Sequence, residues 1–118
     1  NVAKASLVCM MAGADFIKTS TGKESTNANL NNSLVMLRMI REFHGKTGKK
    51  IGFKPAGGIS TAKSVLEFLI LVAEELGFDW VKPNLLRIGA SSLLIDIERQ
   101  LYHYTSGRYA NKEKLAIG

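Results

Sequence analysis

Residues 15–25 read DFIKTSTGKES, and this stretch contains the strand and loop on which the predicted fold is based. It begins with an apolar run of the length of a short β-strand, and that run ends on a lysine. A loop of small and hydroxyl-bearing residues with a second lysine follows, which is typical of a strand that has just ended. Burying an ammonium group is costly, so a lysine at this point suggests that the edge of a sheet needs an amine.

The order of short strand, small-residue loop and amphipathic helix occurs three times along the chain. The expected strands cover residues 15–18, 51–54 and 85–89, and the expected helices cover residues 2–12, 32–44, 61–76 and 91–105. Strands that alternate with helices at this spacing predict right-handed parallel βαβ units. The fold class is therefore α/β, with about three βα units preceded by one helix. Three parallel strands alone would leave two open edges, so we expect further sheet from missing sequence or from a partner.

Capping residues give these helices expected limits. Asn32 or Ser33 is a candidate N-cap for the second helix, and Ser60 or Thr61 for the third. Glycines follow the first, third and fourth helices, where a left-handed residue commonly ends a helix; these are Gly13, Gly77 and Gly107.

The 118 residues suit one small structural unit, and no Pro- or Gly-rich linker divides them. We expect one partial domain over residues 1–107 and a flexible tail over residues 108–118.

The longest apolar run, VLEFLILV at 65–72, is interrupted by Glu67, so no membrane span is predicted. The chain also has no initiator methionine and no signal-peptide pattern, which suggests that it begins inside a longer protein.

The net charge of +6 lies mostly in residues 1–50, which hold eight basic and three acidic residues. The basic residues are scattered rather than interleaved with aromatic ones, so the pattern does not predict nucleic-acid binding. A small anionic substrate explains the surplus about as well, and a solvated surface explains most of these charges.

The residues usually found in metal or hydrolase sites form no such pattern here. His44 and His103 fall on expected helices without metal-ligand spacing, and the Ser91-Ser92 pair lacks a nucleophile elbow. Cys9 lies among apolar residues, and we expect it to be a buried, inert thiol in a reducing, cytoplasmic setting. We therefore expect neither a metal site nor a serine-hydrolase site.

Chemistry in parallel α/β proteins collects at the carboxyl ends of the strands. Two of the three expected strands end on lysine, Lys18 and Lys54, and glycine-rich turns follow the second and third. Such turns before helices expose N–H groups that suit a phosphate; the candidates are Gly57, Gly58, Gly89, Ser91 and Ser92. Ordinary tight turns with capping serines are the alternative for either turn alone.

Lys23 in the sequence TGKE does not belong to a nucleotide-binding P-loop. The first glycine of that motif would fall on Ile17, and Glu24 stands where a serine or threonine should bind magnesium. Lys23 is therefore either an electrostatic partner for an anionic group or an exposed loop lysine.

Lys18 is the candidate nucleophile, which would form a Schiff base with a carbonyl substrate. This role requires a neutral amine, so the pKa of Lys18 must fall from its usual value of about 10.4. Burial would contribute, and so would Lys54 at the equivalent position roughly 4.8 Å away on the next strand. The alternative is a lysine that extends from a strand end into solvent.

Three stretches together resemble the deoxyribose-phosphate aldolase family of class I aldolases. They are GADFIKTSTGK at 13–23, GFKPAGGI at 52–59 and RIGASSLL at 87–94, and the stretch DIERQLYHYTSGRY at 96–109 is most similar to animal members. The resemblance implies part of a TIM (β/α)₈ barrel, strands six to eight, in a cytoplasmic enzyme without a cofactor. It implies reversible cleavage of 2-deoxy-D-ribose 5-phosphate to acetaldehyde and D-glyceraldehyde 3-phosphate.

The resemblance also implies roles for individual residues. Lys18 would be the Schiff-base lysine and Lys54 the lysine that lowers its pKa, in agreement with the reasoning above. Gly22 and Lys23 would join the five residues already named as phosphate candidates. Many family members carry arginine where this chain has Ser60, so the phosphate site is either weakened here or rebuilt around Lys23.

The family's proton-relay aspartate comes from an earlier strand and has no counterpart here. Because a class I aldolase needs an acid/base, we expect little or no aldolase activity from the 118 residues alone. Two alternatives remain open: another phosphosugar class I aldolase, and a non-catalytic partial barrel that self-associates. The expected partner is a small phosphorylated sugar, with no nucleic acid or membrane, and a homo-oligomer remains open.

Overall fold

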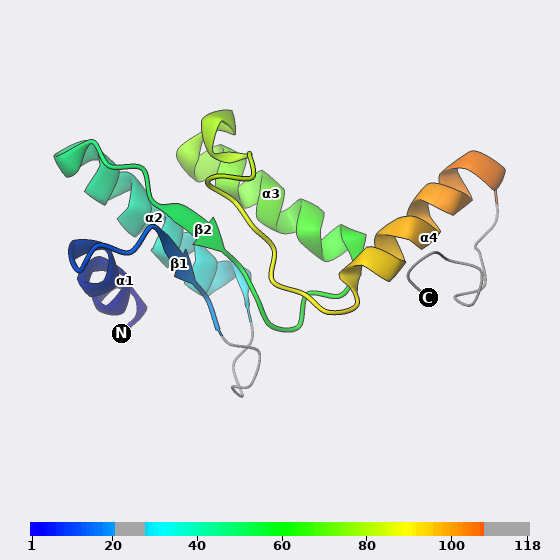
Figure 1. Cartoon of the computed structure of the whole chain (residues 1–118), viewed down its shortest axis with the longest axis horizontal. Coiled ribbons are helices and arrows are strands. Elements are labelled where there is room, and N and C mark those ends of the chain that lie inside the picture. Colours follow the sequence, from blue (N-terminus) through cyan, green and yellow to red (C-terminus); the bar gives the residue numbers. More distant parts are fainter. Residues whose placement is uncertain (21–27, 108–118) are drawn as a thin grey trace.

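The computed structural model describes residues 1–20 and 28–107 of the chain. Its elements in order are α1 (Val2–Met11), β1 (Phe16–Lys18), α2 (Leu30–Thr47), β2 (Gly52–Lys54), α3 (Ala62–Leu76), the 3₁₀ helix η1 (Phe78–Trp80) and α4 (Leu93–Ser106) (Figure 1). The two strands and four helices lie where the sequence pattern predicted them, with ends that differ by at most three residues. Among these residues, no helix combines the length and the apolar character that a membrane span requires.

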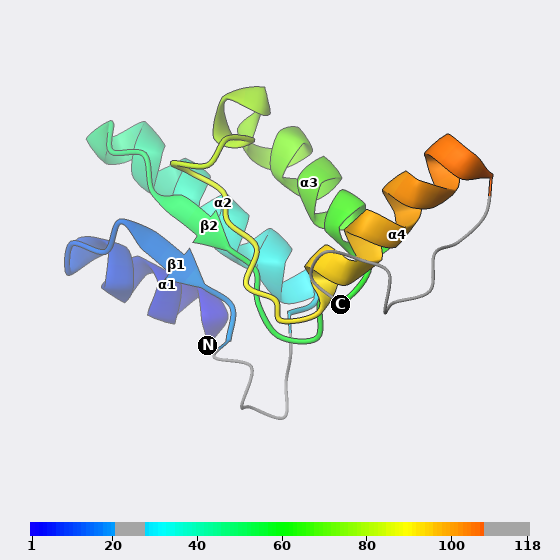
Figure 2. The same ribbon diagram turned by 45° about the vertical axis from the view of Figure 1, so that its right-hand side comes forward.

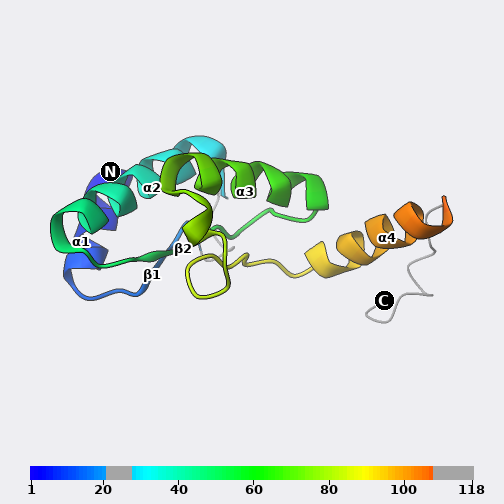
Figure 3. The same ribbon diagram turned by 90° about the horizontal axis from the view of Figure 1, so that it is seen from above.

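The two strands form a parallel sheet in which Phe16 pairs with Gly52, Ile17 with Phe53, and Lys18 with Lys54. Helices α1, α2 and α3 all lie on one face of this sheet, while α4 extends to one side (Figure 3). This one-sided arrangement of helices over parallel strands is what βαβ units produce.

The predicted third strand over 85–89 is wrong as a regular strand, although the segment does run parallel to β2. Only two isolated bridges form, Phe53 with Leu86 and Ala56 with Gly89. Each bridge has its backbone hydrogen bonds, including Arg87 N to Phe53 O at 3.1 Å and Gly89 N to Pro55 O at 2.9 Å. The bond that would join the bridges needs an N–H at position 55, which proline lacks, so Pro55 interrupts the ladder.

The main core lies between the sheet and the helices. Ile17 and Phe53, paired across the two strands, are both buried against it. The other buried members come mainly from α2 and from the segment after α3; they are Met10, Met36, Leu37, Ile40, Ile51, Val72, Trp80, Leu85 and Leu86. A second, smaller core contains Ile59, Phe68 and Leu93, which come from the loop after β2, from α3 and from the start of α4.

The predicted caps are correct for α1, α3 and α4 but wrong for α2. Gly13 and Gly107 adopt positive φ just after α1 and α4, and Gly77 follows α3. The Thr61 side chain caps α3 by accepting a hydrogen bond from Ser64 N at 3.2 Å. At α2 the cap is Asn29, which accepts from Asn32 N at 2.7 Å, so the helix starts before both expected cap residues.

Cys9 is exposed, which corrects the expectation of a buried thiol. Helix α1 is apolar on most of its surface, yet it buries only Ser6 and Met10. Leu7, Val8 and Met11 are exposed as well. With apolar residues all round the helix, the sequence pattern could not indicate which narrow side faces the core.

Trp80 connects the segment after α3 to the start of β2. Its indole Nε1–H donates to Ile51 O at 2.9 Å in a buried hydrogen bond. Its ring also meets the edge of His44, with ring centroids 5.2 Å apart, and the Lys50 ammonium lies 5.5 Å from its centroid.

Replacing Trp80 with Phe should lower the free energy of unfolding by about 1–3 kcal/mol, because the buried Ile51 carbonyl loses its donor while an aromatic ring remains. Urea unfolding measures this change. Asp79→Asn, at an exposed position in the same 3₁₀ helix, is the control and should stay within about 0.5 kcal/mol of wild type. Equal effects of the two substitutions would contradict this role for the indole N–H.

Candidate active site

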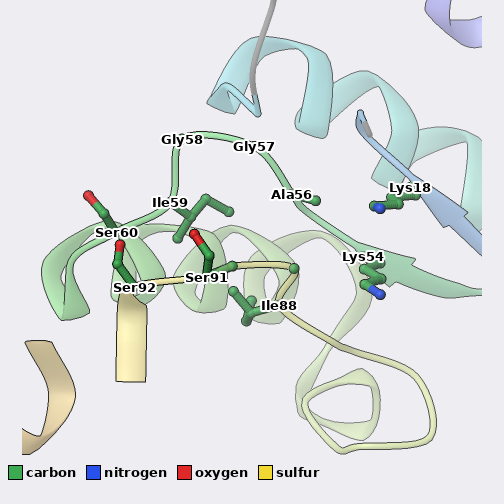
Figure 4. Close-up of a pocket in the computed structure, with 12 residues that line it drawn as sticks. Lys18, Lys54, Ala56, Gly57, Gly58, Ile59, Ser60, Ile88, Ser91 and Ser92 are labelled. Atoms are coloured by element: carbon green, nitrogen blue, oxygen red, sulfur yellow. The ribbon is translucent and has the colours of Figure 1, made fainter. Parts of the chain in front are cut away.

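The candidate site is a cleft of about 700 Å³ at the carboxyl ends of the strands. Its lining comes from the last residue of each strand, from the loop after β2 and from the segment that leads into α4. The lining residues are Lys18, Lys54, Ala56, Gly57, Gly58, Ile59, Ser60, Ile88, Gly89, Ala90, Ser91 and Ser92 (Figure 4). Seven of the nine residues singled out from the sequence thus line one cleft. The other two, Gly22 and Lys23, lie outside the described residues.

Strand alternation places both lysines at the cleft. Successive side chains of a strand point to opposite faces, so Ile17 and Phe53 face the helices while Lys18 and Lys54 face away from them. The two lysines are register partners at the ends of neighbouring strands, as the sequence predicted. Lys54 is half-buried but Lys18 is exposed, so the described residues do not supply the burial that we expected around Lys18.

The cleft has two chemically different ends. Figure 4 shows the side chains of Lys18 and Lys54 at one end and those of Ser60, Ser91 and Ser92 at the other. Gly57 and Gly58 lie along the loop between them, and both have positive φ, at 91° and 75°. The cleft can therefore present amines at one end and hydroxyl and backbone N–H groups at the other.

The start of α4 is better suited to an anion than the start of α3. In the first turn of α3, Ala62 N donates to Asp96 Oδ2 at 2.8 Å and Ser64 N donates to Thr61 Oγ1. Ser92, which precedes α4, makes no capping hydrogen bond with its side chain among the described residues. An anion at Ser91 and Ser92 could therefore bind the first N–H groups of α4. The corresponding N–H groups of α3 already donate to side chains.

Gly89 allows the segment before α4 to approach β2 closely. A Cβ at position 89 would lie 2.7 Å from the Ala56 Cβ and 3.3 Å from the Lys54 Cε. Any larger residue would have to displace the loop after β2 or the Lys54 side chain. Gly89 therefore helps to set the position of Lys54 in addition to its expected role in the turn.

Thr19 and Ser20 have a role that the sequence analysis missed. The Thr19 hydroxyl accepts from Ala56 N and donates to Ala56 O, both at 2.9 Å, and the Ser20 hydroxyl donates to Ala56 O at 3.0 Å. These hydroxyls hold the loop after β2 instead of pointing at a ligand. The only sequence signal was their position directly after Lys18, which does not reveal a partner 37 residues away.

The chain was then compared with known proteins. The profile of the DeoC/LacD family of aldolases matches residues 1–94. This chain belongs to that family. Curated deoxyribose-phosphate aldolases of Mus musculus, Homo sapiens and Bos taurus are 68%, 66% and 64% identical to it over 110 residues. Those matches cover 93% of this chain but 35% of each relative, so the chain spans about a third of their length.

Solved structures show the fold. Two crystal structures of a "putative deoxyribose-phosphate aldolase" from Toxoplasma gondii ME49 superpose with TM-scores of 0.75 and 0.74 at 24% and 22% identity. The matches cover 86% and 87% of this chain and 40% and 41% of those chains. The fold is thus part of a TIM barrel, as the resemblance implied. Among residues 1–20 and 28–107, no group of three or more His, Cys, Asp or Glu is arranged to hold a metal ion.

Thr19→Val should loosen the loop after β2, because it removes both hydrogen bonds to Ala56 while keeping the side-chain shape. We expect a loss of about 1–3 kcal/mol in unfolding free energy and faster hydrogen exchange at the Ala56 amide. Thr105→Val is the matched control, since the Thr105 hydroxyl bonds only carbonyls of its own helix on an exposed surface. Unchanged exchange at Ala56 would show that Thr19 does not hold the loop.

Proposed function

We propose that this chain carries the Schiff-base and phosphate-binding part of a deoxyribose-phosphate aldolase. The supporting observation is the register pairing of Lys18 with Lys54 at one end of a cleft whose other end is formed by Ser60, Ser91 and Ser92. Gly57 and Gly58 lie along the loop between the two ends. The whole enzyme would cleave 2-deoxy-D-ribose 5-phosphate to acetaldehyde and D-glyceraldehyde 3-phosphate. Such a reaction would serve deoxyribonucleotide catabolism in the cytoplasm.

Lys18 is the proposed nucleophile. Its neutral amine attacks the aldehyde carbon C1 of the open-chain sugar, and loss of water from the carbinolamine gives a protonated imine. A base takes the proton of the C3 hydroxyl, the C2–C3 bond breaks, and its electron pair moves toward the imine nitrogen. This step releases glyceraldehyde 3-phosphate and leaves an enamine. Protonation at C2 and addition of water then release acetaldehyde and restore the amine.

Lys54 is proposed to keep Lys18 reactive by charge. Two ammonium groups at neighbouring strand ends would repel each other, and a nucleophilic amine has to be neutral. Lys54 is the half-buried member, and its Cε lies against Gly89, so its position is the more restricted of the two. This restriction suits a fixed charge beside a nucleophile that must move with its substrate.

The phosphate is proposed to bind at the serine end of the cleft. Ser91, Ser92 and the first N–H groups of α4 offer donors in a position where the helix dipole favours an anion. Gly57 and Gly58 let the loop after β2 approach the same end without side chains. Gly22 and Lys23 remain proposed members of this phosphate site from the sequence alone.

Borohydride trapping with acetaldehyde tests the nucleophile. In the polypeptide that carries the whole barrel, reduction should attach an ethyl group to Lys18, and peptide mapping by mass spectrometry identifies the modified residue. Lys18→Arg keeps the charge but should abolish the adduct, whereas Lys82→Met, at an exposed lysine outside the cleft, should leave it unchanged. An adduct at another lysine would contradict the assignment. Turnover of other aldehydes but not of deoxyribose 5-phosphate would favour a different phosphosugar aldolase.

Replacing Lys54 with Met should slow trapping at Lys18 by at least about tenfold at neutral pH, because the neighbouring positive charge is lost. Lys54→Arg keeps the positive charge and should retain more of the rate than Lys54→Met. Equal losses in the two variants would indicate that the amine itself, rather than its charge, is required.

The 118 residues alone should turn over deoxyribose 5-phosphate at least about a hundredfold more slowly than the whole barrel. The proton transfers need a general acid/base, which contributes about 10²–10⁴-fold and which we expect on an earlier strand. A coupled assay for glyceraldehyde 3-phosphate measures both rates. Comparable rates would show that an acid/base lies within these residues.

A further inference from the structure

Asp96 makes a contact that neither the sequence motifs nor the proposed reaction uses. It lies in the first turn of α4, and its Oδ2 accepts a hydrogen bond from Ala62 N, 34 residues earlier, at 2.8 Å. Ala62 is the first residue of α3. One carboxylate therefore joins the beginnings of the two helices that follow the two glycine-rich turns, and Figure 2 shows those beginnings side by side.

This contact lies directly behind the serine end of the cleft. Asp96 lines a small cavity of about 210 Å³ together with Ser60, Ser92, Ile95 and Arg99. Ser60 and Ser92 also line the main cleft, so the two cavities adjoin at these serines. The Asp96 carboxylate is thus separated from the place proposed for the substrate phosphate by Ser60 and Ser92.

At their beginnings the two turns are already joined by the hydrogen bond from Gly89 N to Pro55 O at 2.9 Å. The small core of Ile59, Phe68 and Leu93 also packs the loop after β2, α3 and the start of α4 together. Apolar packing has no preferred bond direction, whereas a partly buried charged hydrogen bond has a defined length and direction. The bond from Ala62 N to Asp96 Oδ2 therefore adds a directional constraint to this packing.

We infer that Asp96 is a positioning residue for the phosphate end of the substrate, an inference that rests on the proposed function. By holding the start of α3 against the start of α4, it sets the distance between the Gly57–Ser60 turn and the Gly89–Ser92 turn. It also occupies the first N–H of α3, which leaves the N-terminus of α4 to the phosphate. The residue acts through these backbone groups and does not touch the substrate.

Substrates with and without phosphate separate this role from general stability. In the whole-barrel enzyme, Asp96→Ala should lower kcat/KM for 2-deoxyribose 5-phosphate about tenfold, mainly through a higher KM. For 2-deoxyribose, which has no phosphate, kcat/KM should change by less than about twofold. Asp96→Asn keeps an oxygen acceptor and should restore most of the preference for the phosphorylated sugar. Glu98→Gln, two residues further along the same helix, is the control and should change neither value.

Binding of inorganic phosphate gives a second readout that does not depend on turnover. Calorimetric titration should show about tenfold weaker phosphate binding in Asp96→Ala and less than about threefold weakening in Asp96→Asn. Equal losses for both sugars would reduce Asp96 to a folding role. Tighter phosphate binding in both variants would show that its charge merely repels the phosphate. Absence of a Lys18 adduct in the wild-type enzyme would instead overturn the proposed function, whatever the phosphate titration shows.

Discussion

The parallel register of β1 and β2 is the constraint on which the rest of this structure depends. Because side chains alternate along a strand, pairing Ile17 with Phe53 buries both against the helices and brings Lys18 and Lys54 together on the other face. A slip of one residue would drive a lysine into the core, at a cost of several kcal/mol for an unpaired ammonium. The same hydrophobic burial that stabilises the sheet therefore selects the arrangement that the proposed chemistry requires.

The loops at the cleft are held by hydrogen bonds that replace regular sheet. Pro55 cannot donate to the neighbouring segment, so the ladder stops just where the backbone must turn toward Gly57 and Gly58. The Thr19 hydroxyl then forms hydrogen bonds with both the N–H and the carbonyl of Ala56. These bonds extend the contact between β1 and β2 beyond the ends of the strands. The irregular geometry of the site is thereby fixed on one side by β1 and on the other by the bridge from Ala56 to Gly89.

The sequence predicted what depends on local pattern and missed what depends on distant partners. Lys18 and Lys54 could be placed together because each ends a short apolar run, and parallel strands bring such ends to one edge. The third strand was overestimated because its pattern shows the apolar residues Leu85 and Leu86 but not the missing donor at Pro55 across the sheet. The exposure of Cys9, the bonds of Thr19 and the contact of Asp96 all depend on which element packs beside them, and no local spacing records that.

The two helix N-termini at the cleft differ in the N–H groups that they leave for the proposed phosphate. The first-turn N–H groups of α3, directly after Ser60, already donate to Asp96 and Thr61. The N–H groups left for an anion lie at Ser91, Ser92 and the first turn of α4, where the Ser92 side chain makes no capping hydrogen bond within the described part of the chain. Attraction to a helix N-terminus falls off within one turn, so the position of α4 determines how well its first N–H groups reach a phosphate. The proposed phosphate site then depends on backbone geometry, and the contacts that set this geometry determine how well the phosphorylated sugar is recognised.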